Sequence, residues 1–167
     1  FKARCLEPDK VREILLREGV DYVGRDNQID VYFNVPGGRL KLRRGNIENS
    51  LIGYEREDYA GAKESKVRLF PVNPENSGSL EEILTKTLGV KVVVIKQRDI
   101  YIARNVKFHV DRVFGLGSFV EVEAIDVDGT IGREKLQQQC DYYKSLLEIK
   151  EEDMVAQSYS NLLLLRR

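Results

Sequence analysis

Residues 106–123 read Val106-Lys107-Phe108-His109-Val110-Asp111-Arg112-Val113-Phe114-Gly115-Leu116-Gly117-Ser118-Phe119-Val120-Glu121-Val122-Glu123. On both sides of the glycines, polar and apolar side chains alternate, as in β-strands whose two faces meet different surroundings. Gly115-Leu116-Gly117 separates the two runs and predicts a turn. The stretch therefore predicts an antiparallel hairpin with strands over 106–113 and 118–126.

The polar faces of the predicted strands are sorted by charge. Glu121 and Glu123 share one face of their strand, whereas Lys96 and Arg98 share a face of another, and the run 39–43 alternates Arg39, Lys41 and Arg43 with two leucines. A solvated face normally mixes signs, because neighbouring like charges repel. We therefore expect these faces to converge inside a curved sheet, where a polyanion with a hard cation would neutralise them. Each strand taken alone also fits the alternative of a solvated outer face.

Further strand-like runs extend the sheet in both directions. Short β-rich segments punctuated by Gly, Pro and Asn cover residues 28–35, 39–44, 51–57, 63–72, 90–97, 99–103, 106–113 and 118–126. Pro36-Gly37-Gly38 and Arg104-Asn105 are further hairpin turn signals. About eight strands joined mainly by hairpins predict an antiparallel sheet that is curled or closed.

Four helices are expected beside the strands, which makes the class α+β. Apolar periodicity predicts helices over 7–18 and 133–147, and a fourth over about 151–164. Ser79 with Glu82 three residues later resembles a capping box that opens a helix ending at Gly89. These helices would cover the apolar face of the sheet, including the face of Val120 and Val122.

Length and composition restrict the classes of function. The chain of 167 residues fits a single domain over 1–167, and its 27 basic and 27 acidic residues balance, which argues against a nucleic-acid partner. No apolar run approaches the length of a membrane span. Its 2 cysteines fit free thiols in a reducing cytoplasm, and its single histidine excludes a zinc site built on several histidines. The sequence also lacks the glycine-rich GxxxxGK[ST] phosphate loop.

The segment His109–Glu123 resembles the H-x-D-x-V-x-G-L-G-x-F-x-E-x-E segment of the CYTH family, which contains class IV adenylyl cyclases and thiamine triphosphatases and is also called the triphosphate tunnel metalloenzymes. The closing run Gln157-Ser158-Tyr159-Ser160-Asn161-Leu162-Leu163 resembles the family's S-Y-x-x-L-L. Segments 30–33, 39–43, 54–58 and 96–98 follow in the order that the family would place them, so the resemblance covers essentially the whole chain.

The resemblance implies a closed or nearly closed eight-stranded antiparallel β-barrel with helices outside. This tunnel would hold a small-molecule triphosphate with Mg²⁺ or Mn²⁺. Its implied metal ligands are Glu121 and Glu123, and the implied phosphate-binding residues are Lys2, Lys41, Arg43, Lys96 and Arg98. Catalytic contributions would come from Asp111, Arg56 and Tyr32, although Tyr32 equally fits a core tyrosine and His109 fits a structural role.

The implied activity is metal-dependent attack on a triphosphate. Hydrolysis is the leading interpretation, and an adenylate cyclase that releases pyrophosphate is the alternative. A non-catalytic polyphosphate- or nucleotide-binding module also stays open, because the family's first strand reads E-x-E-x-K, and only its lysine, as Lys2, falls within this sequence. A homodimer is left open as well. With no ligand bound, we expect the converging like charges to repel one another and strain the tunnel.

Overall fold

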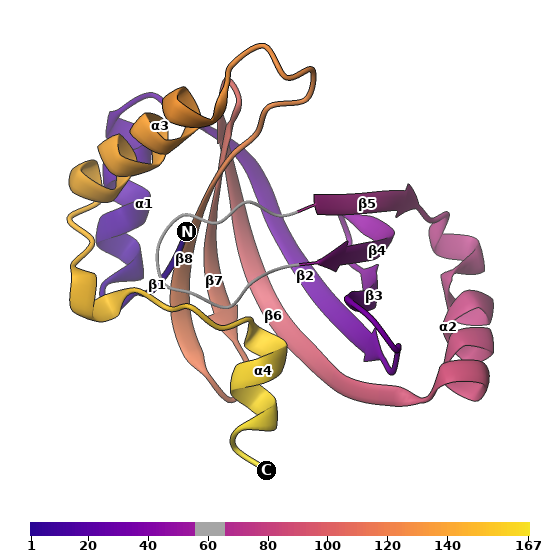
Figure 1. Cartoon of the computed structure of the whole chain (residues 1–167). Helices are drawn as coiled ribbons and strands as arrows, with labels where there is room; N and C mark the ends of the chain where they lie inside the picture. Colours follow the sequence, from indigo (N-terminus) through magenta and orange to yellow (C-terminus); the bar gives the residue numbers. More distant parts are fainter. Residues whose placement is uncertain (56–65) are drawn as a thin grey trace.

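The computed structural model describes residues 1–55 and 66–167 and shows one antiparallel sheet of eight strands in the order β1-β8-β7-β6-β2-β3-β4-β5 (Figure 1). The strands are β1 (Lys2–Arg4), β2 (Asp21–Phe33), β3 (Arg39–Arg44), β4 (Asn49–Glu55), β5 (Lys66–Pro71), β6 (Val90–Ala103), β7 (Val106–Val113) and β8 (Gly117–Ala124). The helices are α1 (Pro8–Arg17), α2 (Pro74–Leu88), α3 (Arg133–Leu146) and α4 (Tyr159–Leu164), with a single 3₁₀ turn at Glu151–Asp153. The α+β class and the antiparallel sheet are confirmed.

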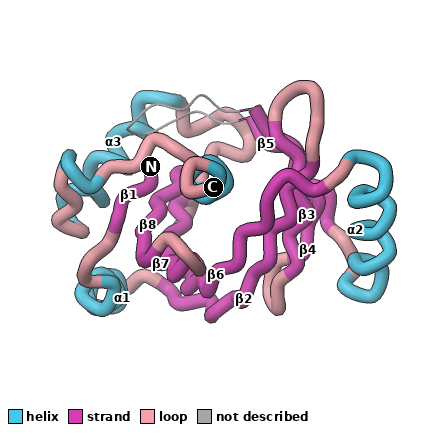
Figure 2. The backbone as a smooth tube through the Cα atoms, turned by 90° about the horizontal axis from the view of Figure 1, so that it is seen from below, coloured by secondary structure: helices cyan, strands magenta, loops and turns pink. Residues whose placement is uncertain are grey.

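The sheet bends into two arms that face each other. The long central strands β2 and β6 form the bend, β7, β8 and β1 form one arm, and β3, β4 and β5 form the other (Figures 1 and 2). The strands β1 and β5 remain as edges, so the barrel is nearly closed rather than closed. The short helix α4 lies on the concave side, between the arms (Figure 2).

Helices cover the outer face of each arm. α1 and α3 lie over β1, β7 and β8, where Ala3, Phe108 and Val120 have no exposed surface. α2 covers the other arm and packs against Phe33 and Leu42. In each arm an apolar face therefore points outward to helices. The charged side chains lie on the inner face, together with an apolar cluster that packs against α4. This confirms the expectation that the face of Val120 and Val122 packs against helices.

The strand boundaries differ from the prediction where polar residues point inward. β6 is one continuous strand, because the alternation that carries Lys96 and Arg98 runs through the predicted break at residue 98. β2 begins at Asp21 rather than residue 28, with a shift of register between Tyr22 and Gly24. Hydrophobic alternation could not reveal this first half of β2, since its inward side chains include Asp26. The turn signals at 36–38, 104–105 and 115–117 all join neighbouring strands, as predicted.

Two helix predictions are wrong in their extent. α2 begins at Pro74, where the side chain of Asn73 accepts a hydrogen bond from the Glu75 amide at 3.1 Å, so Ser79 lies inside the helix and caps nothing. The predicted helix over 151–164 is instead a single 3₁₀ turn, an extended segment, and α4. The extended segment runs beside β1, where the Val155 amide donates to the Lys2 carbonyl at 2.9 Å. This pairing competes with helix formation.

The state of the two cysteines and the character of the helices bear on the environment of the chain. Cys5 and Cys140 are both free and buried, as the sequence predicted. Across residues 1–55 and 66–167, none of the helices combines the length and the apolar character that crossing a membrane would require.

Candidate active site

The register of the sheet brings the predicted charged residues to its concave face. Arg98 lies directly opposite Asp111, and Lys2 lies directly opposite Glu121. Directly opposed residues in an antiparallel ladder share a face. Six of the predicted site residues are buried there: Lys2, Tyr32, Arg43, Lys96, Arg98 and Asp111. The alternative of a solvated outer face is therefore wrong for these side chains.

One carboxylate, Asp30, organises three of the predicted phosphate-binding residues. Its oxygens accept two hydrogen bonds from Arg43, at 2.9 and 2.8 Å, and one from Lys96 at 2.8 Å. Lys41 Nζ lies 3.4 Å from the same carboxylate. Burial alone would raise the pKa of Asp30, but these three cations outweigh it and hold the pKa well below its usual range. The cations of this cluster are thus neutralised in part, so the predicted repulsion among them is reduced by Asp30 but not removed.

Lys96 is the most strongly perturbed of these cations. Its ammonium is almost fully buried, and burial lowers its pKa to about 7, although Asp30 opposes the change. Repulsion from Arg98, Arg43 and Lys41 lowers the pKa further. The cation is therefore only marginally charged near neutral pH, so an additional anion nearby would favour its protonation.

A second buried carboxylate, Asp111, holds Arg98. Arg98 donates two hydrogen bonds to Asp111, at 2.8 and 2.7 Å, and the hydroxyl of Tyr159 donates a third at 2.8 Å. Burial would lower the pKa of Arg98, but Asp111 and Glu121 outweigh it and raise the pKa well above its usual value. This bidentate geometry fixes the guanidinium plane. The sequence predicted a catalytic contribution from Asp111. In the structure its carboxylate holds the guanidinium of Arg98 in place.

The C-terminal segment completes this end of the concave face. Tyr159 comes from α4, and Lys2 Nζ lies 4.2 Å from the centre of its ring. Lys2 Nζ also donates to the carbonyl of Gln157 at 3.0 Å. The ring of Tyr159 packs against Phe119 of β8. The S-Y motif thus supplies a side chain to the site, which its sequence position alone could not show.

Strand analysis also missed a carboxylate on the turn between β3 and β4. Glu48 Oε2 accepts from Lys107 Nζ of β7 at 2.8 Å, and its other oxygen lies 3.6 Å from Arg43. Burial would raise the pKa of Glu48, but Lys107 and Arg43 lower it to about 2. Glu48 therefore connects the two arms across the concave face. Residues 45–48 form a turn, where strand periodicity gives no signal.

The turn that carries Glu48 is built on the buried carboxylate of Asp26. Asp26 accepts hydrogen bonds from the amides of Ile47 and Glu48, at 3.0 and 2.9 Å. A Cβ atom at Gly45 would lie 2.4 Å from an oxygen of Asp26, so the close approach of this turn requires glycine. Asp26 thus fixes the position of Glu48 above the concave face.

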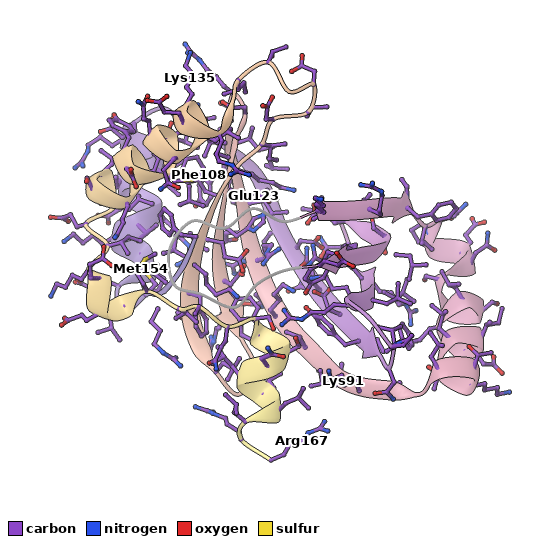
Figure 3. All side chains as sticks on the ribbon, viewed as in Figure 1. Lys91, Phe108, Glu123, Lys135, Met154 and Arg167 are labelled. Atoms are coloured by element: carbon purple, nitrogen blue, oxygen red, sulfur yellow. The ribbon has the colours of Figure 1, made fainter. Side chains whose placement is uncertain are left out.

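The two predicted metal ligands differ in their surroundings. Glu121 lies 3.5 Å from Arg98 and 3.4 Å from His109 Nδ1, whereas Glu123 is exposed toward the upper end of β8 (Figure 3). Within residues 1–55 and 66–167, no three His, Cys, Asp or Glu side chains come close enough to hold a metal ion among themselves. Mg²⁺ is commonly held by one or two carboxylates together with substrate phosphates. The donor set therefore fits a hard cation that enters with a phosphate ligand.

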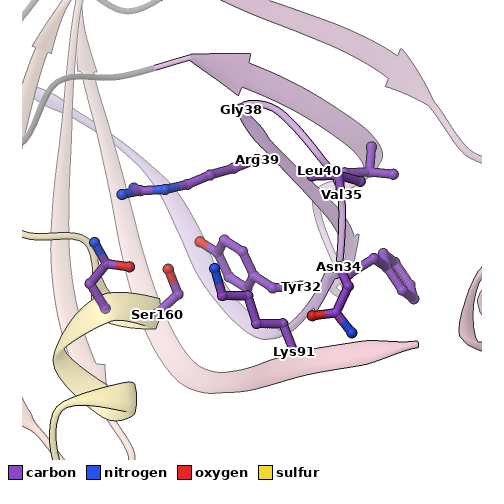
Figure 4. Close-up of a pocket in the computed structure, with 10 residues that line it drawn as sticks. Tyr32, Asn34, Val35, Gly38, Arg39, Leu40, Lys91 and Ser160 are labelled. Atoms are coloured by element: carbon purple, nitrogen blue, oxygen red, sulfur yellow. The ribbon is translucent and has the colours of Figure 1, made fainter. Parts of the chain in front are cut away.

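A small cavity of about 80 Å³ lies at the opposite end of the concave face. Tyr32, Arg39, Lys91 and Ser160 converge on it from β2, β3, β6 and α4 (Figure 4). The Tyr32 hydroxyl accepts from Lys41 Nζ at 3.3 Å, which connects the cavity to the Asp30 cluster. Burial raises the pKa of Tyr32, and Asp30 raises it further, so its hydroxyl remains protonated near neutral pH. Tyr32 thus lies between this cavity and the Asp30 cluster. Arg56, the remaining predicted residue, lies outside the described residues.

Comparisons with known proteins identify the family and the fold of this chain. The family model described as "CYTH domain" matches residues 2–159. No curated protein sequence matches the chain. Among solved structures, the PH1012 protein from Pyrococcus horikoshii has a TM-score of 0.78 and 27% sequence identity, with 96% of each chain covered.

More distant structures share the fold. A putative adenylate cyclase from Vibrio parahaemolyticus has a TM-score of 0.74 and 18% identity, over 98% of this chain and 95% of that one. The Pct1 RNA triphosphatase of S. pombe has a TM-score of 0.53 and 11% identity, over 90% of this chain and 70% of that one. Because the family model matches nearly the whole length, the chain belongs to the CYTH domain family.

Proposed function

We propose that the protein is a divalent-metal-dependent enzyme that hydrolyses a triphosphate on the concave face of its sheet. The observation that carries the proposal is the gathering of buried cations from β1, β3 and β6 on the concave face, where Arg98 lies 3.5 Å from the carboxylate of Glu121 on β8. Buried cations of this number are costly unless anions compensate them. The protein's own carboxylates supply part of this compensation, and a triphosphate would supply more. Family membership and the activities in the names of two distant structural relatives support the same class of substrate.

Each group of side chains has a distinct task in this proposal. Lys41, Arg43 and Lys96, which Asp30 holds in fixed positions, would bind phosphate oxygens at one end of the site. Arg98, oriented by Asp111, and Lys2 would bind the phosphate nearer β8. Such positioned donors stabilise the charge that develops on the leaving group. Mg²⁺ or Mn²⁺, held by Glu121 and Glu123, would polarise a phosphoryl oxygen when bound.

A cyclase is the second candidate function. The same set of cations would accept ATP, and attack by the ribose 3′-hydroxyl on the α-phosphorus would release pyrophosphate. Hydrolysis makes the smaller demand on the site, because it needs no recognition of the base. We therefore place hydrolysis first. The cyclase is supported by the structural likeness to the putative adenylate cyclase from Vibrio parahaemolyticus.

A binding module without turnover is the third candidate. It would use the same cations to hold a polyphosphate or a nucleotide, and it would need no complete metal site. We propose a cytoplasmic location for all three candidates, because both cysteines are free thiols.

The deciding experiment measures phosphate release from inorganic triphosphate, thiamine triphosphate and ATP, with Mg²⁺ or Mn²⁺, using the protein with its natural N-terminus. The ATP reactions are also assayed for cyclic AMP. Metal-dependent phosphate release supports the triphosphatase, and cyclic AMP supports the cyclase. Tight binding of triphosphate without any product would favour the binding module.

Glu121→Gln tests the metal-binding carboxylates. The substitution keeps the shape of the side chain but removes an anionic ligand, so we expect metal-dependent turnover to fall by about 100-fold. The fold should be retained, because Arg98 keeps both of its bonds to Asp111. Glu134→Gln on the exposed surface of α3 is the matched control and should be neutral. Turnover near the wild-type level at limiting Mg²⁺ would show that Glu121 does not bind the metal.

A further inference from the structure

Gln28 is a fully buried polar side chain on the concave face that the proposed function does not yet use. It lies on β2 between Asp26 and Asp30 in the inward alternation, and only 1% of its surface is exposed. Its partner across the ladder on β6 is Lys96. Gln28 therefore lies among the charged side chains of the candidate site.

The orientation of the Gln28 amide is determined by its neighbours. Its nitrogen donates to Asp26 Oδ2 at 2.8 Å and to Glu48 Oε1 at 3.0 Å. Both neighbours are carboxyl oxygens that accept from the amide nitrogen, so a flipped amide would place its own oxygen against theirs. The nitrogen thus uses both of its hydrogens, and the carbonyl oxygen is directed elsewhere.

The carbonyl oxygen of Gln28 has no hydrogen-bond partner among the described residues. Buried acceptors are nearly always satisfied by a protein group, a water or a ligand. The nearest candidate by register, Lys96, directs its ammonium to Asp30 at 2.8 Å. The site therefore offers an oriented, buried acceptor.

The chemistry of a triphosphate limits what this acceptor can bind. Ionised phosphate oxygens accept hydrogen bonds and cannot donate to a carbonyl. The predicted phosphate-binding side chains are lysines and arginines, which suit the phosphates, whereas Gln28 suits an O–H group. In hydrolysis, the reactant that carries an O–H group is the attacking water.

We propose that Gln28 orients the nucleophilic water by accepting a hydrogen bond from it, an inference that rests on the proposed triphosphatase function. With inorganic triphosphate as the substrate, water adds to the terminal phosphorus, the bond to the bridging oxygen breaks, and pyrophosphate leaves with the electron pair. The products are pyrophosphate, orthophosphate and one proton, which passes to solvent. Gln28 takes up no proton. Its role is to fix one hydrogen of the water so that a lone pair faces the phosphorus.

The test compares Gln28→Met with Asn27→Met. Methionine approximates the length of glutamine but offers the water no comparable acceptor, and Asn27 is the neighbouring residue on the outer face of the same strand. For Gln28→Met we expect kcat to fall at least about tenfold, the scale of a lost hydrogen bond. The Kd for inorganic triphosphate with Mn²⁺ should change less than about threefold, because no phosphate contact is lost. Asn27→Met should leave both quantities at the wild-type values.

The measurements distinguish a role of Gln28 in orienting water from a structural role and from substrate binding. Gln28→Met also loses the bonds to Asp26 and Glu48, so a lower melting temperature with unchanged kcat would assign Gln28 to the turn and overturn the proposal. A fall in triphosphate affinity that matches the fall in turnover would also overturn it, because Gln28 would then bind the substrate. If the wild-type protein turns over no triphosphate, the proposed function itself fails and this inference fails with it.

A crystal structure with bound triphosphate gives a readout that does not depend on turnover. An oxygen within about 3.2 Å of Gln28 Oε1 that is present only with triphosphate supports the proposal. The same oxygen in the ligand-free crystal would identify a structural water and contradict it.

Discussion

At Asp30, one buried carboxylate neutralises cations that appear in the sequence as three separate basic residues. Asp30→Asn removes the charge and leaves Lys41, Arg43 and Lys96 without their common partner. Loss of one member of a buried ion cluster typically costs about 3–5 kcal/mol in the free energy of unfolding. We expect the melting temperature to fall by about 6–20 °C, at about 2–4 °C per kcal/mol.

The control for this variant is Asp21→Asn, at the exposed start of the same strand, which should be neutral. The pH dependence has a definite sign, because the pKa of Asp30 is lower in the folded than in the unfolded protein. Its contribution is present above the unfolded pKa and is lost as the pH falls through the folded value. A melting temperature unchanged by Asp30→Asn at pH 7 would contradict the role given to this carboxylate.

Lys96 permits a prediction about the uptake of a proton on ligand binding. Its pKa is about 7 because of burial, with repulsion from neighbouring cations, so at pH 8 it is mostly neutral in the free protein. A bound triphosphate would raise this pKa, and binding at pH 8 should therefore take up a proton. Calorimetry in buffers with different ionisation enthalpies measures this uptake.

The uptake should disappear in Lys96→Met and persist in Lys86→Met, which changes an exposed lysine of α2.

Lys96 also affects the stability of the ligand-free protein. Because its folded pKa lies below its ordinary value of 10.5, the unfolded chain binds the proton more tightly, and stability should rise between about pH 7 and pH 10.5. Triphosphate binding at pH 8 without any proton uptake would exclude this role for Lys96.

At the scale of single elements, α2 shows how a local sequence signal can select the wrong residue. Ser79 and Glu82 have the spacing of a capping box, yet Asn73 forms the cap, and Pro74 follows it at the first helical position. Asn73→Ala should destabilise the protein by about 1 kcal/mol. Ser79→Ala should be neutral or slightly stabilising, because Ser79 lies in the helix interior. Chemical denaturation of both variants measures the free energy of unfolding. A larger decrease for Ser79→Ala than for Asn73→Ala would show that Ser79 is the cap after all.

Individual strands were predictable where their inward and outward residues differ in polarity. β3 and β7 have the predicted bounds, because apolar residues alternate with charged or polar residues along most of each strand. β1 has only three residues and is defined by its pairing with β8, so no local pattern indicates it. Glu48 could not be predicted from a local pattern either, because its position depends on the contact between a turn and the carboxylate of Asp26, which is distant in sequence.

For the whole molecule, charge sorting predicted that the polar faces converge inside a curved sheet. The cations were recognised from their alternation, but their partners were not, because pairing depends on register. Asp30 meets Arg43 directly across the β2–β3 ladder, whereas Lys96 reaches Asp30 from the strand on the other side. Such contacts between segments far apart in the chain explain why the charges of the ligand-free site are partly compensated by the protein itself.

Ligand binding should nevertheless stabilise the whole domain, because a ligand that binds only the folded state shifts the unfolding equilibrium. At a hundredfold excess over Kd the shift is about 2.7 kcal/mol. For a chain of this length we expect a rise in melting temperature of about 5–11 °C with inorganic triphosphate and Mg²⁺ or Mn²⁺. Orthophosphate at the same ionic strength should give little change, because it carries less charge and fewer oxygens and so makes fewer contacts with these cations. Triphosphate with EDTA should give an intermediate rise, since the basic residues bind phosphate without metal.

Identical melting curves with and without triphosphate, for a protein that includes its natural N-terminus, would exclude the concave face as a triphosphate site.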